Sequence, residues 1–325
     1  MSDSKNKVIE TPPIVFIIFN RQDYTKAVFA EIRKAQPKKL FIVADGPRTP
    51  SEEAVCKETR AVVQTIDWPC EVHRNYAEKN LGLKERFRSG LNWFFENVDR
   101  GIILEDDCLP HPSFFKFAGE MLERYRDNER IMMISGDNFL PDFKIENSYC
   151  FSKFFSIWGW ATWQRAWRKY DVTIKSWELP ESKAHLKKIY PQKYMVTYAS
   201  KLFDGIHSGK LNTWDVQWLY TCLMSDSLCI IPGSNLVSNI GVYGTHQGGS
   251  NQNLPTEDIY QHGALRHPNS IELATEYDRM FYEKNFAPGP FNIRKWIISI
   301  LVEYETIKKI YRTMVRLKNF LASKI

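Results

Sequence analysis

The stretch GIILEDD, residues 101–107, is an apolar segment that runs directly into three carboxylates. A continuous run of Ile and Leu is typical of a parallel strand that is buried on both faces. Ligands of open α/β sheets bind outside the carboxyl ends of the strands, where carboxylate oxygens suit Mg²⁺ or Mn²⁺. Glu105, Asp106 and Asp107, the acidic triplet, therefore predict a cation held against a nucleotide diphosphate. The alternative is a solvated acidic turn that caps the next helix.

The first 135 residues alternate between strand-like and helix-like segments. Helices are predicted at 23–35, 51–66, 83–97 and 112–126, and Pro112 suits the first position of a helix. Such alternation is typical of a doubly wound, mostly parallel α/β sheet flanked by helices. The strands are predicted at 14–19, 40–44, 70–75, 101–105 and 131–135.

The region after about residue 140 is rich in tryptophan and is predicted to be helical and irregular. We expect helices at 161–169, 191–208 and 213–225, and a further strand at 228–233. Residues 241–253 form a Gly-rich, polar loop of the kind that orders over a ligand or stays mobile.

Composition indicates a globular protein of a reducing compartment. The 325 residues are 43% hydrophobic and 14% aromatic, which is enough to bury a full core. The six cysteines include no C-x-x-C pair and no His at zinc spacing, which argues against a zinc site or a disulfide scaffold. The N-terminus lacks a signal-peptide core, and no window approaches the roughly 20 apolar residues of a membrane span. We expect a cytoplasmic protein.

The net charge of +6 comes from the C-terminal segment, where residues 290–325 hold eight Lys or Arg against two Glu. A general nucleic-acid binder carries its basic surface through the folded domain, so we expect no nucleic-acid partner. Apolar residues in this segment recur at helical spacing with a basic opposite face, which predicts an amphipathic helix. It would lie on the anionic inner face of a membrane or pack on its own domain or a second subunit.

Polar side chains follow four of the predicted strands. Arg21 follows the first, Asp45 the second, Lys84 the third and the acidic triplet the fourth. Because the carboxyl ends of parallel strands meet at one edge, Asp45 is predicted to accept from a base or ribose, and Arg21 or Lys84 to meet phosphate. The alternative makes Asp45 part of a turn and Arg21 a charge beside a helix.

Glycine fingerprints for phosphate are missing after the first strand, since neither G-x-G-x-x-G nor G-x-x-x-x-G-K-[ST] occurs there. Phosphates must therefore be held in another way, and a metal at Asp107 would do so. This favours nucleotide-sugar chemistry over redox or kinase chemistry.

The segment ILEDDCLPHPSFFKFAGEML, residues 103–122, resembles the metal-site segment of GT-A glycosyltransferases, in particular of the N-acetylglucosaminyltransferase I family. In that family an acidic triplet closes a strand and a Pro-aromatic helix follows. Similar segments occur here in the family's order over residues 14–250: FIIFNR, VADG, ISGDN, WGWATWQRAW, WDVQW and GTHQGG. The resemblance implies a GT-A, Rossmann-like α/β fold and a metal-dependent inverting glycosyltransferase.

For the donor, the resemblance implies that Asp107 ligates Mn²⁺, or Mg²⁺, bridging the diphosphate of a UDP-sugar. Asp106 would contact ribose or sugar hydroxyls, and Glu105, also predicted to belong to the nucleotide-sugar site, would act as inward-facing support. Asp45 would meet uracil, and Arg21 would lie near the nucleotide.

For the acceptor, the resemblance implies a catalytic base at Asp215. In that family the base is the aspartate of a Trp-Asp pair, and Trp214-Asp215 stands at the matching position. Trp214 itself is predicted to contact the nucleotide-sugar. An inverting transfer needs such a carboxylate to take the proton of the attacking hydroxyl. The alternative makes Asp215 a charge at a helix N-terminus.

Two further candidates lie in the second half. His246, in the Gly-rich loop, would bind metal or diphosphate when the loop closes, or would simply be solvated. Trp160, in the segment WGWATW, would place an aromatic face under a sugar, or would pack in the core. Gly159, between two tryptophans, would let the backbone approach a ligand closely.

The sequence therefore predicts a hexosyl- or N-acetylhexosaminyltransferase that acts on a glycan or lipid-linked acceptor in bacterial surface polysaccharide synthesis. The rival functions are a sugar-1-phosphate nucleotidyltransferase, a metal-dependent phosphohydrolase and a membrane-docked scaffold with an inactive transferase fold. The predicted layout is a polar segment at 1–13, a nucleotide-sugar-binding half at 14–140, an acceptor-binding half of the same domain at 141–289, and the helix at 290–325.

Overall fold

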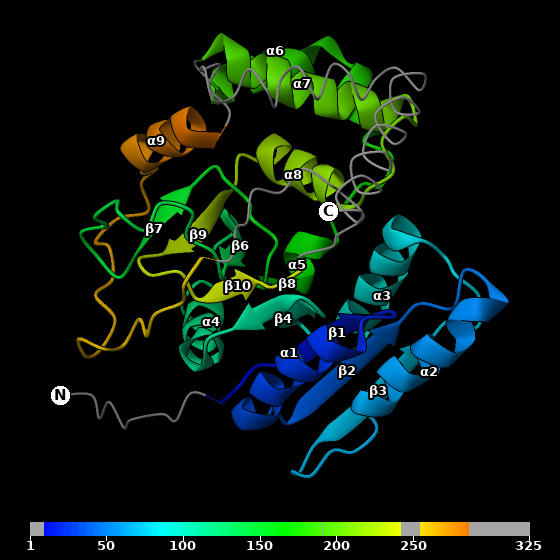
Figure 1. Cartoon of the computed structure of the whole chain (residues 1–325). Coiled ribbons are helices and arrows are strands. Elements are labelled where there is room, and N and C mark those ends of the chain that lie inside the picture. Colours follow the sequence, from blue (N-terminus) through cyan, green and yellow to red (C-terminus); the bar gives the residue numbers. More distant parts are fainter. Residues whose placement is uncertain (1–9, 191, 242–253, 286–325) are drawn as a thin grey trace, which may run out of the picture. The chain divides into compact units, whose positions relative to one another are not determined.

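The computed structural model describes residues 10–190, 192–241 and 254–285. The chain divides into two compact units, Met1–Arg279 and Met280–Ile325, so the division falls inside the last described helix. The fold described below is that of the first unit, whose elements are labelled in Figure 1.

An eight-stranded sheet organises the first unit, in the order β3-β2-β1-β4-β8-β6-β9-β7. The first four strands in this order are parallel. Strand β8 is antiparallel to both β4 and β6, β6 is parallel to β9, and β7 is antiparallel to β9. Six strands therefore run in one direction, and the predicted mostly parallel α/β sheet is confirmed. The strands are β1 Ile14–Ile18, β2 Lys39–Ala44, β3 Glu71–Tyr76, β4 Arg100–Glu105, β6 Ile131–Ser135, β7 Tyr149–Ser152, β8 Trp160–Trp163 and β9 Leu228–Pro232.

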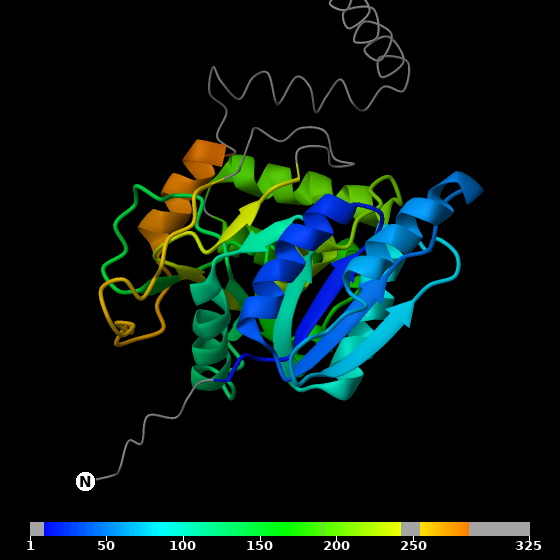
Figure 2. The same cartoon turned by 60° about the horizontal axis from the view of Figure 1, so that its bottom comes forward.

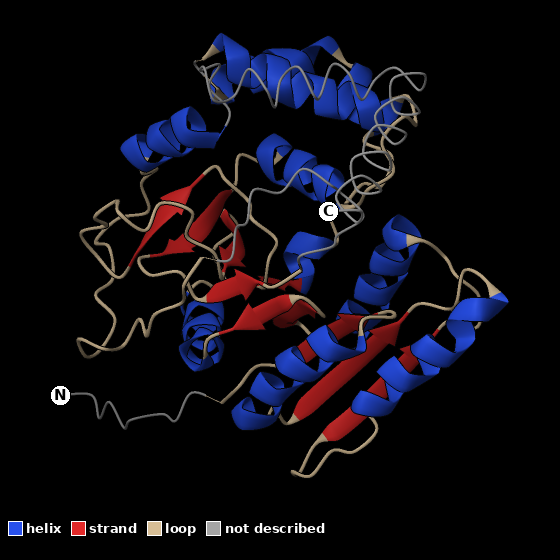
Figure 3. Cartoon of the chain, viewed as in Figure 1, coloured by secondary structure: helices blue, strands red, loops and turns tan. Residues whose placement is uncertain are grey.

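Helices cover both faces of this sheet (Figures 1 and 3). One face carries α1, α2 and α4, and the other carries α3, α5 and α8. The helices are α1 Gln22–Ala35, α2 Glu53–Val62, α3 Leu83–Asn97, α4 Pro112–Arg124, α5 Gln164–Trp167, α6 Pro180–Ile189, α7 Lys193–His207, α8 Asp215–Met224 and α9 Thr275–Asn285, with 3₁₀ turns at Pro50–Glu52 and Lys175–Glu178.

A second, small sheet follows the acidic triplet. Strand β5, Cys108–Pro110, pairs antiparallel with β10, Val237–Asn239. The Ile240 amide extends this pairing by donating to the Asp107 carbonyl at 2.8 Å. The chain around Gly241 is thereby held beside the triplet. Figure 2 shows the molecule from a second direction.

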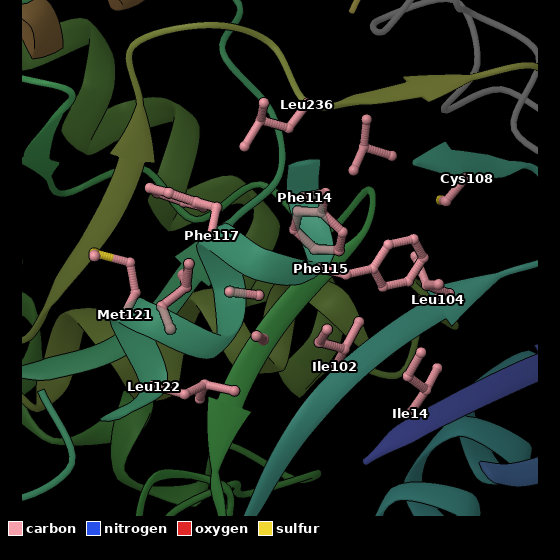
Figure 4. Packing of buried hydrophobic residues seen from close by; sticks show 14 of the residues in the cluster. Ile14, Ile102, Leu104, Cys108, Phe114, Phe115, Phe117, Met121, Leu122 and Leu236 are labelled. Carbon is pink, nitrogen blue, oxygen red and sulfur yellow. The ribbon is translucent and has the colours of Figure 1, made fainter. Parts of the chain in front are cut away.

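The core beneath the triplet is packed by α4 against β4. Phe114, Phe117 and Met121 are fully buried against a layer that includes Ile102 and Leu104 (Figure 4). Burying one such side chain stabilises the fold by roughly 1.5–3 kcal/mol. The strand that ends in the acidic triplet is therefore fixed firmly in place.

The helix predicted at 161–169 is wrong in its first half. Residues Trp160–Trp163 form β8, and only Gln164–Trp167 are helical. Strand β8 is inserted between β4 and β6 and pairs with both, so tertiary pairing overrides the apolar spacing that suggested a helix. Helices α6 and α9 lie where none was predicted.

Several predictions fall outside the described residues. They are the amphipathic helix at 290–325 and the Gly-rich loop from residue 242 onward, with His246. Within the described ranges, none of the helices combines the length and the apolar character needed to cross a membrane.

Candidate active site

The carboxyl ends of the parallel strands meet at one edge of the sheet. Ile17 of β1 pairs with Glu105, and Ile18 pairs with Ala44 at the end of β2. Arg21, Asp45 and the acidic triplet all follow these strand ends. The parallel register thus brings together side chains that are far apart in the sequence.

Arg21 binds two carboxylates of the triplet at once. Its Nη1 donates to Asp107 Oδ2 at 2.7 Å, its Nε donates to Asp106 Oδ2 at 3.2 Å, and its Nη2 donates to Asp106 Oδ1. The side chain of Asp106 is 3% exposed, that of Asp107 13% and that of Arg21 30%. The sequence predicted that Arg21 meets phosphate, and it did not predict this ion pair.

Burial and the neighbouring charges act in opposite directions on the pKa of Arg21, and burial and Arg21 do so on the pKa of Asp106. Burial lowers the pKa of Arg21, but the charges of Asp106 and Asp107 outweigh it, and the net pKa is raised. Burial raises the pKa of Asp106 to about 6, although Arg21 acts in the opposite direction.

Glu105 connects the triplet to Asp215. Burial raises the pKa of Glu105 well above its ordinary value, and the charges of Asp107, Asp106 and Asp215 add to the shift. Trp160 of β8 pairs with Ile103 of β4, two residues before Glu105, and its ring stacks on that of Trp214, the residue before Asp215. The Trp160–Trp214 stack thus connects the start of α8 with β4, the strand that ends in the triplet.

Asp215 is the first residue of α8 and is partly exposed. Its Oδ1 accepts from Thr213 Oγ1. Among the described residues, no side chain or amide donates to Oδ2. The positive end of the α8 dipole stabilises the carboxylate, and the unbonded oxygen is the feature that a general base requires.

Asp45 has a structural role that the sequence did not reveal. Its buried Oδ1 accepts from the amides of Gly46 at 2.8 Å and Leu81 at 2.9 Å. Its Oδ2 accepts from Asn80 Nδ2 at 3.0 Å and from the Gly82 amide at 3.1 Å. Both oxygens hold the segment that leads into α3, and the contact with uracil stays a prediction.

Trp160 does not offer a face to a sugar, contrary to the sequence prediction. It is fully buried, and its ring lies 5.9 Å from that of Trp214 in a stacked arrangement. Trp214 is 2% exposed and stacks on Phe87 of α3 at 4.0 Å. The two predicted ligand-contacting tryptophans instead form a buried stack, because core packing uses both faces of the Trp214 ring. That stack seats Asp215, the residue after Trp214.

Lys84 lies in the first turn of α3 and is partly exposed. In the part of the chain that the structure describes, its ammonium makes no ion pair or hydrogen bond, and no contact links it to the triplet. Its contact with phosphate stays a prediction.

Asp107 offers hard oxygen ligands that suit Mn²⁺ or Mg²⁺. Residues 10–190, 192–241 and 254–285 contain no group of three His, Cys, Asp or Glu placed to hold a metal by themselves. Such cations, however, are commonly held by one or two carboxylates together with substrate phosphates. A Cβ on Gly241 would lie 2.5 Å from Asp107 Oδ2, so any larger residue at this position would force the carboxylate to shift. The donor set fits a metal that shares its ligands with a diphosphate.

Sequence reasoning missed Thr213 and Gly241. A Thr two residues before an Asp at a helix start is a recognisable local signal for a hydroxyl–carboxylate bond. The closeness of Gly241 to Asp107 depends on the β5–β10 pairing and has no local signal.

No protein-family model matches the sequence, and no curated protein matches it. Among solved structures, the chain is similar to the galactosyltransferase LgtC in complex with donor and acceptor sugar analogues, with 11% identity, 65% of this chain and 70% of that chain covered, and a TM-score of 0.32. It is similar to WbbM, a bifunctional glycosyltransferase, with 10% identity, coverage of 69% and 38%, and a TM-score of 0.28. UDP-glucose pyrophosphorylase complexed with UDP-glucose gives 11% identity, coverage of 45% and 64%, and a TM-score of 0.25. These likenesses are loose and carry no argument about this chain.

Proposed function

We propose that the chain is a metal-dependent, inverting glycosyltransferase of the GT-A type that transfers a sugar from a UDP-sugar. One observation carries the proposal: the stacked rings of Trp160 and Trp214 connect β4, which ends at Glu105, with the start of α8 at Asp215. Glycosyl transfer needs one charged centre for the donor diphosphate and another for the acceptor hydroxyl, and the proposal assigns these roles to the triplet and to Asp215.

On the donor side, Asp107 would hold the metal, and Arg21 would lie beside the diphosphate. A divalent cation, when bound, offsets the charge that develops on the departing diphosphate. Asp106 is buried and tied to Arg21, so it orients the guanidinium at the donor site.

On the acceptor side, Asp215 Oδ2 would accept the proton of the attacking hydroxyl. The acceptor oxygen bonds to the anomeric carbon as the bond from that carbon to the diphosphate oxygen breaks, which inverts the configuration. Thr213 keeps Oδ1 fixed, so that Oδ2 is presented in one orientation.

The proposal includes a glycan or lipid-linked acceptor and a setting in bacterial surface polysaccharide synthesis. Its support is the sequence of residues 290–325, whose basic, amphipathic pattern suits an anionic membrane surface.

A donor panel tests the donor side. UDP- and GDP-sugars are titrated with Mn²⁺ by calorimetry into wild type, Asp107→Ala and the control Asp127→Ala, whose side chain is 84% exposed. We expect a UDP-sugar to bind wild type and the control, and to lose at least about tenfold in affinity with Asp107→Ala. The proposal is wrong if no nucleotide-sugar binds wild type. It is also wrong if the affinity changes neither with Mn²⁺ nor with Asp107→Ala.

A second variant tests the base. Asp215→Asn should keep donor affinity while transfer falls by a factor of about 10² to 10⁴, the usual contribution of a general base. Retained turnover would assign Asp215 to structure.

A further inference from the structure

Arg21 occupies the carboxylate that the proposed function assigns to the metal. Its guanidinium lies 2.7 Å from Asp107 Oδ2 and contacts both oxygens of Asp106. A free divalent cation that approaches Asp107 meets a positive charge already in place. It must break a charge-assisted hydrogen bond and then remain close to the displaced cation.

The geometry also shows how Arg21 can leave Asp107 without leaving the site. A guanidinium has five N–H donors in a fixed planar fork, and the contacts to the two aspartates use three of them. Nε and Nη2 can stay on Asp106 while Nη1 turns to another acceptor. Because 30% of the side chain is exposed, an incoming anion can reach it.

A bound diphosphate would make this exchange more favourable, because it brings negative charge to both the guanidinium and the metal cation. Its oxygens would accept the N–H donor that Arg21 withdraws from Asp107, and the Asp107 carboxylate would then be free to help hold the metal. The negative charge of a bound diphosphate would also offset the repulsion between the guanidinium and the cation.

We propose that Arg21 is a built-in counterion that reserves Asp107 for a divalent cation arriving with a nucleoside diphosphate. The ligand of this site is then the metal–diphosphate complex, and free metal binds poorly. The inference rests on the proposed function for the identity of the diphosphate. It adds that metal and nucleotide bind with strong positive coupling and that Arg21 is the residue responsible.

Mn²⁺ binding, followed by the electron paramagnetic resonance of free Mn²⁺, tests this without an activity assay. Wild type should bind Mn²⁺ weakly alone, and saturating UDP should raise the affinity at least about tenfold, within the usual range of coupling between sites. By reciprocity, Mn²⁺ should raise the affinity for UDP by the same factor.

The variants separate competition from general charge effects. Arg21→Gln should bind Mn²⁺ alone about tenfold more tightly than wild type and should lose most of the coupling. Arg21→Lys, a point charge that cannot span both aspartates, should be intermediate. Arg33→Gln is the matched control, because Arg33 lies in the last turn of α1, the helix that Arg21 precedes, and pairs with the exposed Asp67 at 3.2 Å. It should behave as wild type.

Two results would overturn the inference. In the first, Arg21→Gln binds Mn²⁺ alone no more tightly than wild type does. In the second, UDP does not change the affinity of wild type for Mn²⁺. If Arg21→Gln does not fold, the inference is tested by the Mn²⁺ affinity of Arg21→Lys and by the effect of UDP on the Mn²⁺ affinity of wild type. Failure of every UDP-sugar to bind wild type would overturn the proposed function, while the comparison of Mn²⁺ alone between wild type and Arg21→Gln still decides whether Arg21 competes for Asp107.

Discussion

Thr213 donates its hydroxyl hydrogen to Asp215 Oδ1, and the two residues flank the buried Trp214. Thr213 is itself held, because Gln217 Nε2 donates to its carbonyl at 2.7 Å. Thr213→Val should lower kcat about tenfold, the value of one hydrogen bond to a charged group, and leave the donor Kd unchanged. Thr213→Ser should restore kcat. Unchanged turnover in Thr213→Val would show that the hydroxyl does not position the base.

Gly241 leaves room for the Asp107 carboxylate. In Gly241→Ala the new Cβ would meet Asp107 Oδ2 at 2.5 Å, so the carboxylate must move. We expect the affinity for a UDP-sugar with Mn²⁺ to fall at least about tenfold, with a change below about 1 kcal/mol in the free energy of unfolding. The control is Asp107→Ala, in which the added Gly241→Ala should change nothing further. If the two substitutions reduce the affinity for the UDP-sugar additively in the double variant, Gly241→Ala does not act by moving the Asp107 carboxylate.

Asp45 accepts four hydrogen bonds, three from the segment at 80–82 and one from the Gly46 amide. Asp45→Asn replaces one accepting oxygen by a donor and leaves buried N–H groups unpaired, so the free energy of unfolding should fall by about 3 kcal/mol. Urea unfolding measures the effect. The matched control, Asp67→Asn, changes an exposed carboxylate and should cost less than about 1 kcal/mol. Equal losses of unfolding free energy in the two variants would contradict the structural role of Asp45.

Asp278 of α9 makes the stability of the fold depend on pH. It accepts from Ser152 Oγ at 2.6 Å and from the Lys153 amide at 3.1 Å, and burial raises its pKa to about 7. The unfolded pKa is about 3.9, so the folded chain binds more protons between these values, and stability falls as pH rises from about 4 to about 7. The loss is at most about 4 kcal/mol and levels off at higher pH.

The Asp278→Asn variant isolates this contribution. The amide cannot ionise, so its free energy of unfolding, measured in urea at pH 5 and pH 8, should fall less over this interval than that of wild type. Parallel pH profiles of the two proteins would show that Asp278 does not titrate as described.

Much of the fold was readable from the sequence because the first half has strong local patterns. Buried runs such as IVFII and IMMIS form strands as predicted, and the residues at the ends of β1, β2 and β4 share one edge because the register is parallel. Strand β8 was not readable, because its pairing with β4 and β6 comes from tertiary contacts.

The site was readable in its residue types but not in its pairing. Arg21 and Asp106 are 85 positions apart, and only the folded sheet brings them into contact. The burial of Trp160 was also hidden, since a tryptophan beside a glycine suits a ligand platform as well as a core. Asp45 looked like a ligand contact because the sequence does not show that four donors converge on it.

The most direct test of the central claim follows the anomeric proton by NMR while wild type, with Mn²⁺, hydrolyses UDP-sugars in the absence of an acceptor. We predict that at least one α-linked UDP-sugar is consumed and that the β-anomer appears first, with Asp215→Asn inactive and still able to bind the donor. The α-anomer appearing first, or no consumption of any UDP-sugar, would contradict the account.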